Sequence, residues 1–175
     1  MKKIMALFLG AITLAFTGCT PGCTPDESKI IKATESVAKA TGAVIKLTKM
    51  DATTQTNIVV VLEEVRKAVP GDGKTCAETW TPIIQKTVAD LVAKGKLNKT
   101  QADIVETSAV IAANGVDYIL KKYSEIGKDV DLASKVVNTF VDTLKTSLDI
   151  EVTEKGDYDK EAYEYLLGVQ RSLKK

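Results

Sequence analysis

Few residues in this chain of 175 residues could perform catalysis. Histidine is absent, which removes the commonest general base and the commonest metal ligand. Cys76 therefore has no histidine to activate it as a nucleophile. Glu63 and Glu64 are adjacent carboxylates, but neighbouring positions on a helix point in different directions. Because Arg66 and Lys67 follow them and neutralise their charge, we interpret the pair as a solvated helix face.

Two other patterns match ligand sites only in part. The segment 71–75 ends like a phosphate-binding loop, but Ala68 stands where that motif needs its first glycine, and no strong strand precedes it. We interpret this segment as a turn. Asp129 and Asp131 alternate as in a calcium loop, yet no glutamate completes the loop, and helix capping explains them better. The sequence therefore predicts no catalytic residue, no metal site and no cofactor.

Cys19 is a candidate for a different chemistry, because it ends an apolar N-terminal segment. Two lysines precede an uncharged run from Ile4 to Phe16, and Gly18 stands directly before Cys19. A basic start, an apolar centre and small residues at a cleavage point are typical of secretory signal peptides. The run is shorter than the roughly 20 residues that span a bilayer. We therefore predict that residues 1–18 are a cleaved signal peptide.

The sequence Phe16-Thr17-Gly18-Cys19 resembles the lipobox of bacterial lipoproteins, although Phe16 replaces the usual leucine. The resemblance covers only the first 19 residues. It implies that Cys19 becomes an acylated first residue, carrying fatty acid such as palmitate, that anchors the protein to a membrane. Thr20 stands where aspartate favours the inner membrane. The resemblance thus implies an envelope protein, placed at the outer membrane and facing the periplasm in a Gram-negative host.

Two alternatives concern this N-terminal segment. Cys19 could be incidental to an ordinary secretory peptide. Cys23 offers a competing acylation site, which Pro21 and its distance from the apolar run disfavour. With cleavage before Cys19, residues 19–25 form a short tether ahead of a single domain over residues 26–175.

If Cys19 carries lipid, two cysteines remain, Cys23 and Cys76, and they could pair with each other. Because exported proteins meet oxidising conditions, we predict a disulfide bond between them. It would close a loop of about 53 residues and stabilise the fold by roughly 4 kcal/mol. The alternative is two free thiols.

Composition limits the classes of partner. Removing residues 1–18 takes away two lysines and leaves 22 basic against 23 acidic residues in 157. No long run of one sign remains, so we expect no nucleic-acid binding. A chain of this length buries about 70% of its unfolded surface, which is enough for one core.

Hydrophobic periodicity predicts an all-α fold, a single compact bundle of five or six helices. Thr24 and Glu27 form the capping box that begins the first helix. Further helices are expected over about 51–69, 82–94, 98–124, 129–148 and 157–175. The helix over 98–124 is the expected central helix, because its apolar face includes small residues that let neighbouring helices approach.

The segment around Pro82 is ambiguous. Thr75 and Glu78 have the spacing of a capping box, but a helix beginning there places Pro82 in its second turn. Proline inside a helix costs about 3 kcal/mol. We therefore predict a turn over residues 76–80 and a helix that begins at Pro82.

These observations leave three functions open. The first is a membrane-tethered, non-catalytic binding or scaffold protein with an envelope protein as partner, of which a phage- or plasmid-encoded exclusion protein is a specialised form. The second is a carrier of a small apolar ligand between helices, and the third is a cell-envelope enzyme. The aromatic residues Tyr158, Tyr163, Tyr165 and Trp80 are either helix packing or a partner-binding patch.

Overall fold

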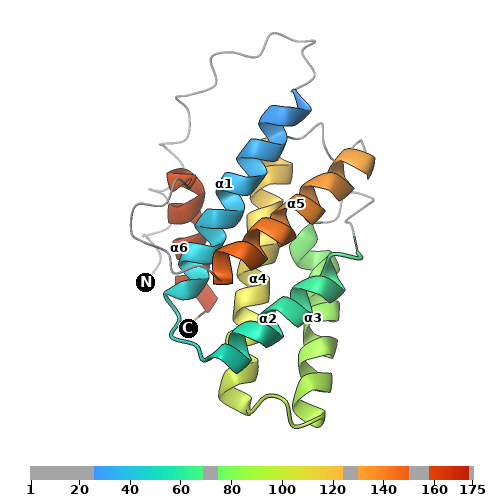
Figure 1. Ribbon diagram of the computed structural model, residues 1–175, viewed down its shortest axis with the longest axis vertical. Coiled ribbons are helices and arrows are strands. Elements are labelled where there is room, and N and C mark those ends of the chain that lie inside the picture. The colour runs from blue at the N-terminus through green and yellow to red at the C-terminus, as the bar shows by residue number, and fades with distance from the viewer. Residues whose placement is uncertain (1–25, 69–74, 124–129, 150–157, 174–175) are drawn as a thin grey trace, which may run out of the picture.

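The computed structural model describes residues 26–68, 75–123, 130–149 and 158–173. These residues form six helices and no strand: α1 Glu27–Lys46, α2 Ala52–Val65, α3 Cys76–Ala93, α4 Lys99–Lys122, α5 Val130–Asp149 and α6 Lys160–Leu173. Figure 1 shows them packed side by side as a compact bundle. The prediction of an all-α bundle is confirmed.

Helix α4 is the centre of the bundle, because it contacts each of the other five described helices. Its inward face is fully buried at Val105, Ala109, Ala112, Val116 and Ile119. Small residues on this face allow close approach. A Cβ atom on Gly115 would lie 2.6 Å from Thr41 Oγ1 of α1 and 2.7 Å from Phe140 Cζ of α5. The prediction of a central helix with a small-residue face is therefore confirmed.

Helices α1 and α5 pack side by side and run in the same direction (Figure 1). Lys135 and Glu27 form an ion pair of 2.9 Å near their starts. Near their ends, a Cβ atom on Gly42 would lie 2.8 Å from Ser147 Cβ. Gly42 and Gly115 thus place α1 against both α5 and α4 with no room for an added methyl group.

Helix α6 follows α1 in the same direction and is held by a buried amide. Gln170, which is 4% exposed, donates from Nε2 to Val44 O at 3.1 Å and to Thr48 Oγ1 at 3.2 Å. At the other end, the Asp159 backbone N–H donates to Ser36 O. These bonds set the register of α6 along α1.

The helix starts agree with the capping signals in part. Asp51 caps α2, and Asn98 forms a capping box with Gln101 at α4, as predicted. Helix α1 instead has Asp26 as its N-cap, with the Asp26 carboxylate accepting from Ser28 N–H at 3.0 Å. Thr24 lies outside the described residues.

The prediction for the segment around Pro82 is wrong, because α3 begins at Cys76 and contains Pro82. Thr75 and Glu78 form the complete capping box. The helical conformation also buries Cys76 and Trp80, which are both 0% exposed, and lets Trp80 Nε1 donate to Ala68 O at 2.7 Å. These contacts offset the roughly 3 kcal/mol that an internal proline costs.

Candidate functional site

Of the three cysteines, only Cys76 lies within the described residues; Cys19 and Cys23 lie outside them. Cys76 is a free thiol at the first position of α3 and has no exposed surface. Burial, and then the negative charge of Asp117, raise the pKa of the Cys76 thiol far above its ordinary range. A protonated, enclosed thiol is unsuited to act as a nucleophile. The disulfide with Cys23 stays a prediction.

Asp117 of α4 is the partner of Cys76. Its Oδ1 accepts from Cys76 N–H at 2.5 Å, and its Oδ2 accepts from Ala77 N–H at 3.0 Å. The carboxylate therefore caps α3 from a neighbouring helix, where the helix dipole also favours negative charge. Desolvation raises the pKa of Asp117, while the two backbone hydrogen bonds act in the opposite direction.

A raised carboxyl pKa is also a common property of catalytic acids. Both oxygens of Asp117 are already used by the α3 backbone, however, so they are committed to holding the helix start. The buried thiol of Cys76 is its immediate neighbour. We therefore assign this pair a structural role.

The aromatic residues predicted as a possible patch do not all share one surface. Trp80 is completely buried. Tyr158 and Tyr163 contact each other with ring centroids 5.2 Å apart, and Tyr165 of α6 contacts Tyr118 of α4 with centroids 5.5 Å apart. Of Trp80 and these four tyrosines, only Tyr165 is exposed, with 44% of its surface accessible to solvent. The tyrosines thus serve mainly as packing for α6.

A charged cluster adjoins this contact between α4 and α6. Lys122 Nζ lies 5.4 Å from the Tyr118 ring centroid, 3.4 Å from Asp159 and 4.0 Å from Glu161. Desolvation lowers the pKa of Lys122, but the nearby Asp159 charge and other partners outweigh it, so the pKa is raised. The cluster keeps its lysine charged and joins α4 to the first turn of α6.

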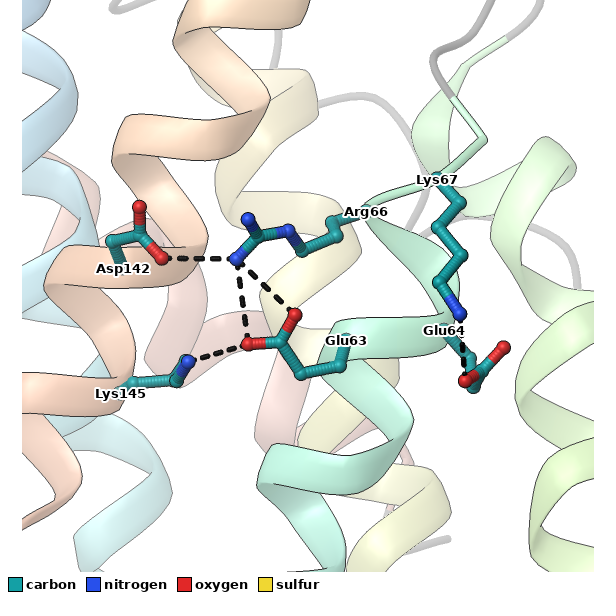
Figure 2. Close-up of polar contacts among 6 residues, drawn as sticks. All are labelled: Glu63, Glu64, Arg66, Lys67, Asp142 and Lys145. Atoms are coloured by element: carbon teal, nitrogen blue, oxygen red, sulfur yellow. Dashed lines mark hydrogen bonds and ion pairs between the residues drawn. The ribbon is translucent and has the colours of Figure 1, made fainter.

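The acidic pair Glu63 and Glu64 points in two directions, as expected (Figure 2). Glu63 pairs with Arg66 and with Lys145 of α5, and Arg66 also reaches Asp142 at 3.0 Å. Glu64 pairs only with Lys67 among the partners drawn. The Lys145 hydrogen bond is the main cause of the lowered pKa of Glu63. These pairs join α2 to α5 and form no acid–base couple.

The residues that the structure describes, 26–68, 75–123, 130–149 and 158–173, offer neither a metal site nor a membrane span. These ranges hold no group of three or more cysteine, aspartate or glutamate side chains that could bind a metal ion. Within the same ranges, no helix is both long enough and apolar enough to cross a bilayer. Comparisons with protein-family models, curated proteins and solved structures found no match.

Sequence reasoning missed two polar residues that organise the interior. Asp117 is the only charged residue between Glu106 and Lys121, and this isolation within an apolar stretch is the signal that could have found it. Gln170 lies on the buried side of α6 between Leu166 and Leu173, with no comparable signal in its spacing.

Proposed function

We propose that the protein is a membrane-tethered, non-catalytic binding or scaffold lipoprotein of the bacterial envelope, anchored by an acylated Cys19. The observation that carries the proposal is the short distance along the chain between the lipobox and the folded body. Asp26 already caps α1, so only residues 19–25 separate the anchor from the bundle. Seven residues span at most about 25 Å, which keeps the body next to its membrane.

The bundle itself supports a role in binding rather than in carrying a ligand. A carrier of a small apolar ligand needs space between helices, whereas α1, α4 and α5 are in close contact at Gly42 and Gly115. The alternative of an envelope enzyme gains nothing from Asp117, whose carboxylate caps α3. A compact tethered body of this kind suits an adaptor, including an exclusion protein encoded by a phage or plasmid.

The anchor is tested by comparing the native chain with Cys19→Ser in intact cells. We expect the N-terminal peptide of the native protein to begin at Cys19 and to carry the mass of acyl chains, and the protein to fractionate with membranes. The Cys19→Ser protein should lack the acyl mass. An unmodified Cys19, or cleavage at another position, would contradict the anchor.

The binding role is tested by cross-linking in the same two strains. A specific envelope protein cross-linked to the native form, and lost with Cys19→Ser, would support the adaptor. If neither form captures a protein while an apolar molecule co-purifies with the native form, the carrier alternative replaces it.

A further inference from the structure

Helix α1 has an exposed face with a marked excess of positive charge. Lys29, Lys32, Lys39 and Lys46 are separated by three, seven and seven residues, a spacing that places them on one side of a helix. The first three are exposed and Lys46 is half-buried. Glu35 is the only acidic residue among the exposed positions between Lys29 and Lys46. We call the four lysines the α1 lysine face.

This arrangement differs from that of α6, one of the two helices that flank α1 at the surface. The exposed charges of α6 are balanced, because Lys160 and Arg171 are basic and Glu161 and Glu164 are acidic. Within the described residues, Lys29, Lys32 and Lys39 form no ion pair. Lys29, Lys32 and Lys39 therefore present charge that no ion pair within the described residues neutralises.

The rest of the bundle covers only the opposite side of α1. Val37, Thr41 and Val44 are buried, and α1 contacts α4, α5 and α6. In Figure 1, α1 runs along the outside of the bundle with α5 and α6 on either side. The α1 lysine face thus extends along an unpartnered surface about 25 Å long, at 1.5 Å per residue.

We propose that the α1 lysine face lies on the surface of a membrane containing anionic phospholipid. The inference rests on the proposed anchor, because the tether of residues 19–25 ends at the first turn of α1. Helix α1 is therefore the helix nearest along the chain to the acylated residue. Lys29, Lys32 and Lys39 complement lipid phosphates, and each lysine close to an anionic surface strengthens binding roughly fivefold.

Such contact fixes the orientation of the body. With α1 against the membrane, the described helices that α1 does not contact, α2 and α3, are left for a partner. An acyl chain supplies attachment but leaves orientation free, whereas a row of charges along a helix supplies orientation. The proposal thereby adds to the tethered adaptor the side on which its partner binds.

The test uses acylated protein purified from membranes and reconstituted in two kinds of vesicle, phosphatidylcholine alone or phosphatidylcholine with phosphatidylglycerol. An amine-reactive reagent labels exposed lysines, and peptide mass spectrometry reports each site. We expect labelling of Lys29, Lys32 and Lys39 to fall severalfold only in the anionic vesicles. Lys86 on α3, Lys96 in the loop that follows α3, and Lys99 at the start of α4 are the internal controls and should label equally in both. At 1 M salt, where the Debye length is about 3 Å, the protection should disappear.

Matched variants separate this face from net charge. The triple variant Lys29→Gln, Lys32→Gln and Lys39→Gln should abolish the lipid-dependent protection of Lys46. The triple variant Lys86→Gln, Lys96→Gln and Lys99→Gln loses the same charge and should retain it. All six positions are exposed, so both proteins should keep the circular dichroism of the native bundle.

Three results would overturn the proposal: equal labelling of the face in both vesicles, protection in neutral vesicles as well, or protection of the control lysines instead. Protection in neutral vesicles would assign the face to contact between tethered copies. The acyl mass of the N-terminal peptide is measured first and tests the anchor separately. If Cys19 is unmodified, the anchor fails, and co-sedimentation of the same protein with the two kinds of vesicle then tests the face alone.

Discussion

Asp117 and Cys76, 41 positions apart in the sequence, meet where α4 passes the start of α3. The carboxylate accepts the Cys76 N–H at 2.5 Å and the Ala77 N–H at 3.0 Å. Two of the four N–H groups that a helix start leaves without partners are thus bound by another helix. The contact ties the beginning of α3 to the centre of the bundle.

Removing the carboxylate should loosen this connection. We expect Asp117→Ala to lower the free energy of unfolding by about 1–2 kcal/mol, because the Cys76 and Ala77 N–H groups lose their acceptors. Urea unfolding followed by circular dichroism measures the change. Asp103→Ala, at an exposed position of α4, is the control and should change stability by less than about 0.5 kcal/mol. Equal effects of the two substitutions would mean that Asp117 does not hold α3.

The ionisation of Asp117 predicts a pH dependence of known sign. Desolvation raises the pKa of the folded carboxyl above its ordinary value of about 4. The folded state therefore binds this proton more tightly than the unfolded state does. The resulting stability is fully present below about pH 4 and is lost as the pH rises through the raised pKa.

Asp117→Asn isolates this contribution, because it removes the titration and keeps the shape of the side chain. The stability of the native protein relative to Asp117→Asn should be greatest at about pH 4 and should fall toward pH 7. Urea unfolding of both proteins at intervals across this pH range gives the difference in their free energies of unfolding. The contributions of the other carboxylates are the same in both proteins and cancel in this difference. A difference that grows with pH would show that the backbone hydrogen bonds outweigh desolvation.

The same contact explains where sequence reasoning failed. Thr75 and Glu78 signalled the correct start of α3, but the cost of Pro82 was weighed against local capping alone. The stabilising terms that decide the matter are the Asp117 carboxylate and the buried Trp80, which join segments distant in sequence. Such contacts have no local pattern, so a short segment containing proline cannot be assigned from spacing alone.

Features that depend on nearby residues were predictable. The apolar stripe of α4, with small residues at Ala109, Ala112 and Gly115, correctly predicted a central helix. The caps at Asp51 and Asn98 also correctly predicted two helix starts. The candidate site was harder to predict, because Gln170 and Lys122 have roles set only by the partners they meet in the folded bundle.

Two glycines in helices predict opposite effects of the same substitution. Gly115→Ala would place a Cβ atom 2.6 Å from Thr41 Oγ1 and 2.7 Å from Phe140 Cζ. Overpacking should lower the free energy of unfolding by about 1–3 kcal/mol, even though alanine favours helix. Gly168→Ala on α6 meets no atom within 4 Å and should raise stability by about 0.5–1 kcal/mol. Thermal and urea unfolding of the two variants check the contrast, and stabilisation by Gly115→Ala would contradict the close contact of α1, α4 and α5.

The thiol of Cys76 should be unreactive while the protein is folded. It has no exposed surface, and burial raises its pKa, so the thiolate that attacks iodoacetamide is scarce at pH 8. We expect no alkylation at Cys76 in the folded protein, and a free Cys76 thiol should react only after unfolding in urea without reductant. Modification of the native protein at the rate of a small-molecule thiol would show that the start of α3 opens readily.

The unfolded, non-reduced sample also tests the predicted disulfide. A peptide joining Cys23 to Cys76 in the mass map would confirm the bond, and its loss on reduction would be the control. Alkylation of both cysteines before reduction would exclude it. In that case no covalent link holds the start of α3 in addition to Asp117, and Asp117→Ala should have the same effect with or without reductant. A bonded Cys76 would instead retain α3 through residue 23, so the effect of Asp117→Ala should increase when reductant is added.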